Sequence, residues 1–160
     1  MQGNLITCPG CGLILPKKNY LPDNNYKTSK ECFELFAQLS GYTLTLNYTE
    51  FIHQLVVDSY GAQHSGGDTK NITAVFSLIG LCLANEHNYT GRQIQKVHMN
   101  IPKQKWPRLE PPKQAGLLTV QNVLGANSEL EESIKKWAKS VWESWFEHHN
   151  WIRQRTKDNI

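Results

Sequence analysis

The pattern of apolar and polar positions is helical along most of the chain. Apolar residues recur every three or four positions, and several of these runs begin with a residue that caps helix N-termini. Helices are expected over residues 29–40 and 47–60, from residue 68 or 69, from residue 90 to just before residue 102, briefly after residue 119, and from residue 128 to about 155. The sequence therefore predicts an all-α fold, an irregular bundle of about five helices.

Specific residues mark the expected helix ends. The expected N-caps are Ser29, Asn47, Asp68 or Thr69, Thr90, Thr119 and Ser128. Asn47, Thr90 and Ser128 are each followed three positions later by Glu or Gln, which is the capping-box pattern. Gly41 is expected to end the first helix, and the helix that begins near Thr90 is expected to stop before Pro102.

The third expected helix has the widest apolar face, which predicts a central position in the bundle. The residues on this face are Ile72, Val75, Phe76, Ile79, Cys82 and Leu83. The segment 103–116 reads as an extended connector packed by Trp106. The last expected helix carries a single apolar stripe, formed by Ile134, Trp137, Val141, Trp145, His148 and Ile152.

The first 28 residues lack helical periodicity. They contain Pro16, Pro22 and the turn-prone run Asp23-Asn24-Asn25. We expect residues 1–28 to form a loop-rich segment that packs on a helical bundle of residues 29–155, within one domain of residues 1–160. A chain of 160 residues buries enough surface to fold without covalent cross-links.

The most specific motif lies in this first segment and reads Cys8-Pro9-Gly10-Cys11-Gly12. The two-residue gap lets both thiolates bind one metal ion, and glycine supplies the unusual backbone torsions of such a knuckle. A redox pair is the competing interpretation. Redox Cys-x-x-Cys motifs begin a helix after a strand, and the nearby glycine and prolines disfavour that context. The motif therefore predicts a metal site, with zinc as the expected ion.

A structural zinc takes four protein ligands, and no second Cys-x-x-Cys follows in the chain. The other two ligands are therefore expected from the helices. An antiparallel pairing of the first two helices would return the end of the second to the start of the first and bring His64 to Cys32. The predicted ligands are Cys8, Cys11, Cys32 and His64.

Two alternatives to this ligand set stay open. Cys32 lies on an apolar stripe, where a free cysteine is also a common buried residue. His53 precedes His64 by eleven residues. That spacing corresponds to roughly 16 Å along a helix, too far for the two to share an ion. His53 is expected to be hydrogen-bonded inside the bundle, and it would replace Cys32 or His64 if the helix pairing were different.

Polar residues just before His64 suggest either support for the metal or catalysis. Asp58 or Gln63 is expected to accept the second ring proton of His64 and to fix its tautomer. The alternative is an open metal site in which His148 joins His53 and Asp58, as in a metal-dependent hydrolase or transferase. No nucleophile motif or phosphate-binding glycine loop names a reaction. A structural zinc site is favoured, because two cysteines at this spacing normally help to close a coordination shell.

Charge and hydropathy exclude several classes of function. The formal charge of +3 arises from 17 basic and 14 acidic residues that are scattered along the chain, so nucleic-acid binding is not expected. No apolar run approaches the ~20 residues that span a bilayer. The N-terminus lacks a secretory signal, so a cytoplasmic location and no membrane contact are expected. A protein partner or a second copy of the chain is expected to meet an exposed face.

Several motifs follow one another in a recognisable order. They are Cys8-Pro9-Gly10-Cys11-Gly12, Cys32, His53-x4-Asp58-x-Tyr60-x2-Gln63-His64, Leu109-Glu110-Pro111-Pro112 and Trp137-Ala138-x2-Val141-Trp142-x2-Trp145-x2-His148-His149. In this order the chain resembles a bacterial family of unknown function. The resemblance implies one compact domain and a bacterial cytosolic origin, and it implies no activity. The chain departs from the family pattern at Ser59, where alanine is expected, and at Ser65, where proline is expected.

Overall fold

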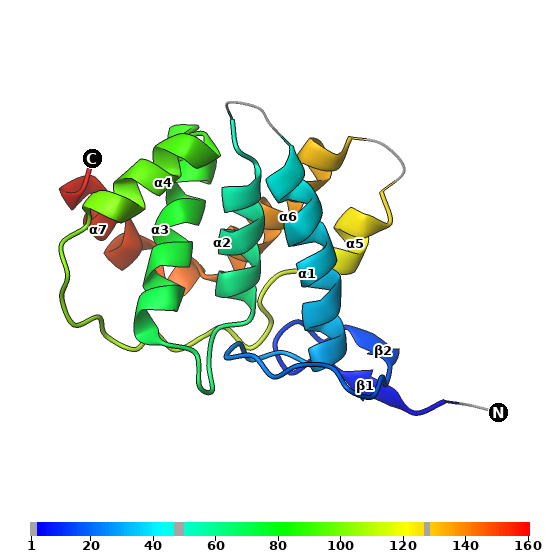
Figure 1. Cartoon of the computed structure of the whole chain (residues 1–160). Coiled ribbons are helices and arrows are strands. Elements are labelled where there is room, and N and C mark those ends of the chain that lie inside the picture. The colour runs from blue at the N-terminus through cyan, green and yellow to red at the C-terminus, as the bar shows by residue number, and fades with distance from the viewer. Residues whose placement is uncertain (1–2, 47–49, 127–128) are drawn as a thin grey trace.

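The computed structural model of the chain describes residues 3–46, 50–126 and 129–160. Within these ranges it contains seven α-helices, one 3₁₀ turn and a small two-stranded sheet (Figure 1). The elements, in chain order, are β1 (Leu5–Thr7), β2 (Ile14–Pro16), α1 (Lys30–Thr45), α2 (His53–Gln63), α3 (Asn71–His87), α4 (Gly91–Asn100), α5 (Val120–Leu124), α6 (Leu130–Ser144), the 3₁₀ turn η1 (Phe146–His148) and α7 (His149–Asp158). The mostly helical fold agrees with the sequence prediction, although the helices are more numerous than expected.

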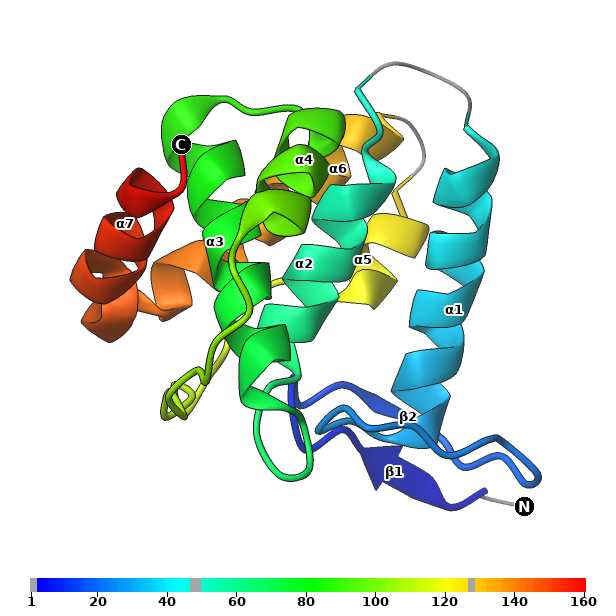
Figure 2. The same ribbon diagram turned by 60° about the vertical axis from the view of Figure 1, so that its left-hand side comes forward.

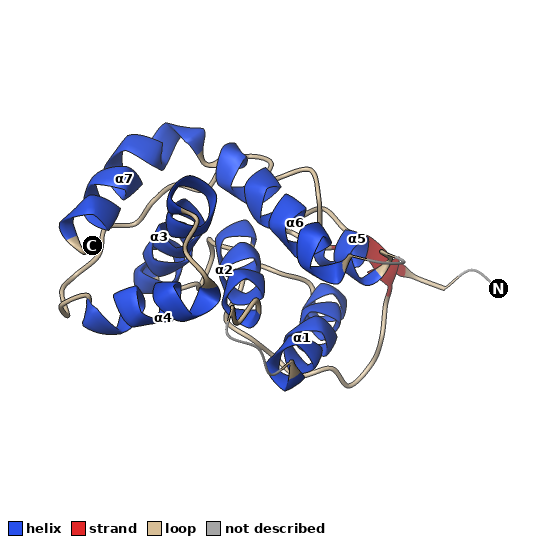
Figure 3. Cartoon of the chain, turned by 90° about the horizontal axis from the view of Figure 1, so that it is seen from above, coloured by secondary structure: helices blue, strands red, loops and turns tan. Residues whose placement is uncertain are grey.

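Helix α3 lies at the centre of the structure, as its wide apolar face predicts. It packs against α2, α4, α6 and α7, and its residues Val75, Ile79, Cys82 and Leu83 are completely buried. Ile72 is exposed because it lies in the first turn of the helix, outside the core. Seen from above, α1, α2 and α3 stand side by side (Figure 3), and α6 runs along one side of this row, in contact with α2 and α3.

Several predicted helix ends are confirmed. The Ser29 side chain caps α1 by accepting a hydrogen bond from the Cys32 amide, and Thr90 and Thr119 form capping boxes at the starts of α4 and α5. Helix α4 ends at Asn100, before Pro102. These ends could be located from the sequence, because a cap acts within its own turn of helix.

Gly41 does not end α1, which continues to Thr45. The continuation is stabilised by Thr43, which is buried and whose hydroxyl lies 2.9 Å from Nδ1 of His53. A glycine within a helix costs about 1 kcal/mol relative to alanine, and tertiary contacts of this kind offset such a cost. The burial of Thr43 against α2 thus overrides the local signal at Gly41.

The predicted starts of three other helices have different outcomes. The expected caps Asn47 and Ser128 lie outside the described residues. Helix α3 begins with Lys70 as N-cap and not with Asp68 or Thr69. The Thr69 hydroxyl instead donates to the backbone carbonyls of Asn25 and His64, so it ties two loops together and does not cap the helix.

The expected single C-terminal helix is wrong, because the chain breaks into α6, η1 and α7 at Trp145. The imidazole of His149 donates from Nε2 to the backbone carbonyl of Trp142 at 2.7 Å, and its ring stacks on the Trp142 indole. The Trp142 carbonyl thus accepts from this imidazole and from the Trp145 amide at 3.1 Å, the latter a bond between residues three apart as in a 3₁₀ turn. Trp145 and Ile152 are both buried, but Trp145 lies at the break after α6 and Ile152 lies in α7.

The N-terminal segment contains a β-hairpin that the sequence pattern did not predict. Strands β1 and β2 pair antiparallel, with Leu5 opposite Pro16 and Thr7 opposite Ile14. Each strand has only three residues, too few for alternation to stand out from a loop. The hairpin lies at the N-terminal end of α1 (Figure 1). Among the described helices, none is both long and apolar enough to cross a membrane.

Candidate metal centre

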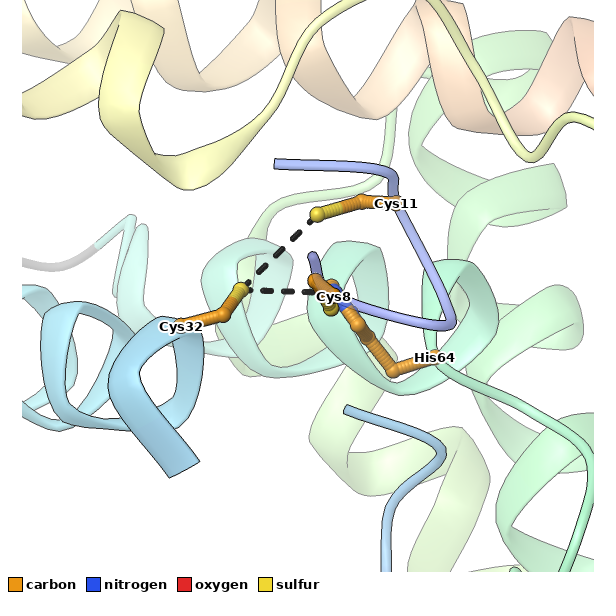
Figure 4. A group of neighbouring side chains, drawn as sticks. All are labelled: Cys8, Cys11, Cys32 and His64. Atoms are coloured by element: carbon orange, nitrogen blue, oxygen red, sulfur yellow. Dashed lines mark hydrogen bonds between the residues drawn. The ribbon is translucent and has the colours of Figure 1, made fainter. Parts of the chain in front are cut away.

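Four side chains from three separate segments meet where α1 begins and α2 ends. They are Cys8, Cys11, Cys32 and His64, and their donor atoms all lie within 4.8 Å of one another (Figure 4). Cys8 and Cys11 belong to the turn between β1 and β2, Cys32 lies in the first turn of α1, and His64 directly follows α2. Helices α1 and α2 run side by side in opposite directions (Figure 2), so the expected return of His64 to Cys32 is confirmed.

Two of the distances between donors match those around a tetrahedral ion. The Sγ atoms of Cys11 and Cys32 are 3.8 Å apart, and Sγ of Cys32 lies 3.6 Å from Nε2 of His64. Zinc bonds of about 2.3 Å to sulfur and about 2.0–2.1 Å to nitrogen, at tetrahedral angles, place donors about 3.8 Å apart for two sulfurs and about 3.6 Å for sulfur and nitrogen. The four cysteines of the chain are all free. The arrangement can therefore hold one metal ion.

His64 is oriented by the helix that precedes it. Its Nδ1 donates to the backbone carbonyl of Tyr60 at 3.0 Å, and its ring stacks on the Tyr60 ring with centroids 3.8 Å apart. Metal-binding histidines commonly donate their second ring proton in this way, which fixes the tautomer. Nε2 thereby faces the thiols, and it can bind a metal ion once its own proton is released. The prediction that Asp58 or Gln63 accepts the second ring proton of His64 is therefore wrong.

Two hydroxyl groups support the thiols. The Tyr60 hydroxyl lies 3.4 Å from Sγ of Cys32, and the Thr28 hydroxyl lies 3.3 Å from Sγ of Cys8. The two hydroxyl oxygens are 2.7 Å apart. Sequence reasoning did not assign these roles to Thr28 and Tyr60. The one available signal was the position of Tyr60 four residues before His64, which puts both on the same face of a helix.

The glycines of the knuckle are required by its geometry. A Cβ atom at Gly10 would overlap the backbone carbonyl of Lys27 and the ring of His64. Gly12 has a φ of +79°, a left-handed conformation that side chains disfavour, and its amide donates to the Cys8 carbonyl. The turn can therefore bring Cys8 and Cys11 against His64 only with glycine between and after them.

The centre is buried and its proton affinities are strongly perturbed. Cys8, Cys32 and His64 are buried, and Cys11 is half-buried. Interaction with the Cys11 thiol lowers the pKa of Cys8, whereas interaction with Cys32 raises the pKa of Cys11. Burial lowers the pKa of His64, but its contacts with the Cys32 and Cys8 thiols outweigh burial and raise that pKa to about 9. Crowded thiols that share protons in this way can exchange them for a cation.

A model of the family described as "Family of unknown function (DUF5946)" matches residues 6–146 of the chain. The chain belongs to this family. The expected membership of a family of unknown function is therefore confirmed, and the matched range of the DUF5946 chain includes all four clustered side chains. No curated protein and no solved structure matches it.

The remaining predicted site residues of the DUF5946 chain do not join the cluster. His53 contacts Thr43, and the ring of His148 donates from Nε2 to the backbone carbonyl of Glu110 at 3.0 Å. Gln63 is buried and donates to two backbone carbonyls of residues 115 and 118. Each is therefore occupied by a structural contact away from the cluster.

Asp58 is buried between α2 and α3 and lies apart from His53 and His148. Its Oδ1 accepts a hydrogen bond from Gln54 at 3.1 Å, and its Oδ2 is buried without a partner in the described structure. Burial raises the pKa of this carboxyl well above its ordinary value. Within the described residues, the cluster of three cysteines and His64 is the one group of three or more potential metal ligands close enough to share an ion. The expected open site of His53, Asp58 and His148 is therefore not assembled.

Proposed function

We propose that this DUF5946 protein is a zinc-binding helical domain that works by binding and not by catalysis. One structural zinc ion, held by Cys8, Cys11, Cys32 and His64, would join the N-terminal hairpin to the first pair of helices. The observation that carries the proposal is the convergence of three thiols and one oriented imidazole within 4.8 Å of one another, with the distances from Cys32 to Cys11 and to His64 at tetrahedral values. Such a donor set is typical of structural zinc and unsuited to calcium or magnesium, which prefer oxygen.

The closed ligand set favours a structural role over a catalytic one. Four protein donors complete a tetrahedral shell, whereas catalytic zinc keeps one position open for water or substrate. Three of the four side chains are buried, which further limits access to the ion. The alternative function, a metal-dependent hydrolase or transferase, would need a shell with at most three protein ligands.

A structural ion would supply what the N-terminal segment lacks. Among residues 3–28, Cys8 is the one buried residue, and the outward side chains Leu5 and Ile14 are mostly exposed. The segment thus contributes little apolar burial of its own. Zinc binding in small zinc-finger peptides supplies roughly 10–16 kcal/mol, enough to order such a segment. The reducing cytosol that the sequence predicts would keep the thiols available for the ion.

Elemental mass spectrometry of the native protein, paired with thiol titration before and after a chelator, tests the proposal. We expect one zinc per chain, three thiols shielded until chelation, and loss of zinc in Cys11→Ser. Cys82→Ala is the matched control, because Cys82 is buried in the core and does not belong to the cluster. Native protein without metal and with freely reactive Cys8 and Cys11 would contradict the zinc proposal and favour a redox pair.

Replacement of zinc by Co²⁺ separates the structural role from the catalytic one. A closed shell of three thiolates and one imidazole gives Co²⁺ an intense tetrahedral visible spectrum with sulfur charge-transfer bands. Because no coordination position is open, added cyanide should leave this spectrum unchanged. A spectrum that shifts with cyanide would reveal an open position and would support the hydrolase or transferase alternative.

A further inference from the structure

A groove lies between the segment of residues 110–118 and the end of α6 with η1, residues 140–148. Its volume is about 1000 Å³. The floor includes the buried Trp145, and Pro111 and Pro112 contribute to the wall of residues 110–118. This groove is separate from the metal centre, because none of the four clustered side chains lines it.

The two walls of the groove are joined at one end by Ser140. Its hydroxyl accepts hydrogen bonds from the backbone amides of Leu117 at 2.7 Å and Leu118 at 3.2 Å. Gly116 permits this approach, since it has a φ of +101° and a Cβ there would lie 2.9 Å from the Ser140 hydroxyl oxygen. The close approach of residues 116–118 to α6 is therefore built into the backbone.

Two further side chains hold the same segment in place. His148, in the opposite wall, donates to the Glu110 carbonyl at 3.0 Å and so joins the walls at the other end. Gln63, at the end of α2, donates to the carbonyls of Ala115 at 2.9 Å and Leu118 at 2.7 Å. The groove is thus preformed, and a ligand would not have to order its walls.

Large apolar side chains stand exposed on both rims of the groove. Leu117 on one wall is 82% exposed, and Phe146 on the other is 68% exposed. Exposed apolar residues that flank a hollow mark binding sites, and scattered ones do not. A small molecule would be enclosed by its pocket, whereas rims that stand free in solvent suit a chain segment that lies across them.

The charge around the groove is acidic, although the chain as a whole carries a formal charge of +3. Glu110, Glu143 and Glu147 line it together with a single lysine, Lys113, which leaves a formal excess of two negative charges. Glu143 has one distant ion-pair partner, Lys139 at 3.9 Å. Within the described residues, Glu110 and Glu147 form no ion pair. These carboxylates are therefore available to a cationic partner.

A second hollow provides an internal comparison. It lies between α6 and the residues around the α3 to α4 connection, with a volume of about 550 Å³. Its charged lining residues are Glu50, Glu131, Glu132, Lys135, Lys136 and Lys139. Charges there balance, and two of the glutamates pair with lysines on the same helix. The acidic excess thus distinguishes the groove beside η1.

We propose that this groove binds a peptide segment of a protein partner, with two apolar side chains that contact Leu117 and Phe146 and with flanking lysine or arginine residues. The carboxylates of Glu110, Glu143 and Glu147 select the basic flanks, and the apolar rims supply the contact area. This inference rests on the binding role in the proposed function and names its surface, but it does not depend on the metal.

Selection of a random peptide library displayed on phage, with the full zinc-loaded chain as bait, tests the proposal. Enriched peptides should combine apolar residues with lysine or arginine. Their affinity, measured by fluorescence anisotropy, should fall about tenfold or more in the double variant Leu117→Ser and Phe146→Ser, since central apolar contacts dominate such interfaces. Substitution of the three groove glutamates by glutamine should weaken binding and flatten its salt dependence.

Met99→Ser is the matched control, because Met99 is a similarly exposed apolar residue on α4, outside the groove. The control should bind the peptides as the native chain does. Failure to enrich peptides, enrichment of acidic peptides, or binding that the rim variants leave unchanged would overturn the proposal. A chain that sediments as a dimer, and becomes monomeric in Phe146→Ser, would identify a second copy as the occupant and would overturn it as well. Zinc content measured on the same variants keeps this outcome separate from the metal proposal, since rim variants should retain the ion.

Discussion

The ring of His64 donates to the backbone carbonyl of Tyr60, four residues earlier in the chain. The same tyrosine stacks its ring on His64, and its hydroxyl reaches the sulfur of Cys32. One residue thus contacts two of the four clustered side chains through its carbonyl, its ring and its hydroxyl. Residues that orient ligands in this way influence metal affinity without binding the ion.

Tyr60→Phe should weaken zinc binding while it leaves the fold intact. The substitution removes the hydroxyl that supports Cys32 but keeps the stacked ring and the carbonyl. Loss of one such support should lower zinc affinity by about tenfold, measured by competition with a chromophoric chelator. Tyr26→Phe is the control, because Tyr26 belongs to the same aromatic cluster but does not contact Cys32 through its hydroxyl in the described structure. Equal affinities of the native protein and Tyr60→Phe would rule out the supporting role.

Removal of the metal should release the hairpin before the helical core. The amides of Cys8, Gly12 and Lys27 are hydrogen-bonded around the proposed ion, the last to the carbonyl of His64. After chelation, hydrogen exchange at these amides should accelerate strongly, while amides of α3 around Leu81 should stay protected because that helix is buried on its own account. Added zinc should restore the slow exchange. Hairpin amides that exchange at the same rate with and without the ion would show that zinc does not hold this segment.

The buried carboxyl of Asp58 should make stability depend on pH. Burial raises its folded-state pKa above the ordinary value of 3.8. Its contribution to the free energy of unfolding is therefore fully present below pH 3.8. As the pH rises further, the unfolded chain ionises first, and stability should fall by about 1.4 kcal/mol per pH unit until the folded-state pKa is reached. Asp58→Asn lacks this ionisation and should gain stability relative to the native protein over the same range.

Urea unfolding of both proteins between pH 5 and 8, values chosen to lie above ~pH 4 where an unperturbed Asp ionises, measures this difference. Both proteins contain the same four clustered side chains, so any effect of pH on the cluster cancels in the comparison. Asp68→Asn is the control, because Asp68 is exposed. A difference in unfolding free energy that does not change with pH would contradict a neutral Asp58 in the folded state.

Glycine at position 80 should be required by the same carboxyl. A Cβ at Gly80 would collide with Oδ2 of Asp58, so Gly80→Ala should destabilise the fold by about 2 kcal/mol or more through overpacking. Gly41 offers a matched substitution in α1, where an added Cβ meets nothing within 4 Å. Gly41→Ala should stabilise by about 0.5–1 kcal/mol, because alanine restricts the unfolded chain and favours helix. Thermal unfolding of the two variants should therefore shift in opposite directions.

The double variant Gly80→Ala and Asp58→Ala provides a check on the cause. If the collision with the carboxylate explains the destabilisation, removal of that side chain should reduce the penalty of alanine at position 80. The penalties of the two substitutions should then be clearly non-additive, as expected for residues in contact. Additive effects would place the strain at Gly80 elsewhere, such as at the neighbouring Ile94.

Local signals in the sequence determined most of the helical fold. The caps at Ser29, Thr90 and Thr119 act within one turn, and the apolar face of α3 repeats every three to four residues, so both can be recognised without a structure. The spacing of Cys8 and Cys11 marked a knuckle for the same reason. Pairing of the first two helices then sufficed to predict that His64 would meet Cys32.

Several hydrogen bonds, some between near residues and some between distant segments, became known only from the tertiary structure. The carbonyl of Tyr60 orients His64, and every residue carries a carbonyl, so no sequence pattern distinguishes it. The His149 ring reaches back to the Trp142 carbonyl where the last helix breaks, and Gln63 holds residues 115 and 118 from more than fifty positions away. Such hydrogen bonds depend on which segments packing brings together, whereas caps and periodicity depend on near neighbours in the chain.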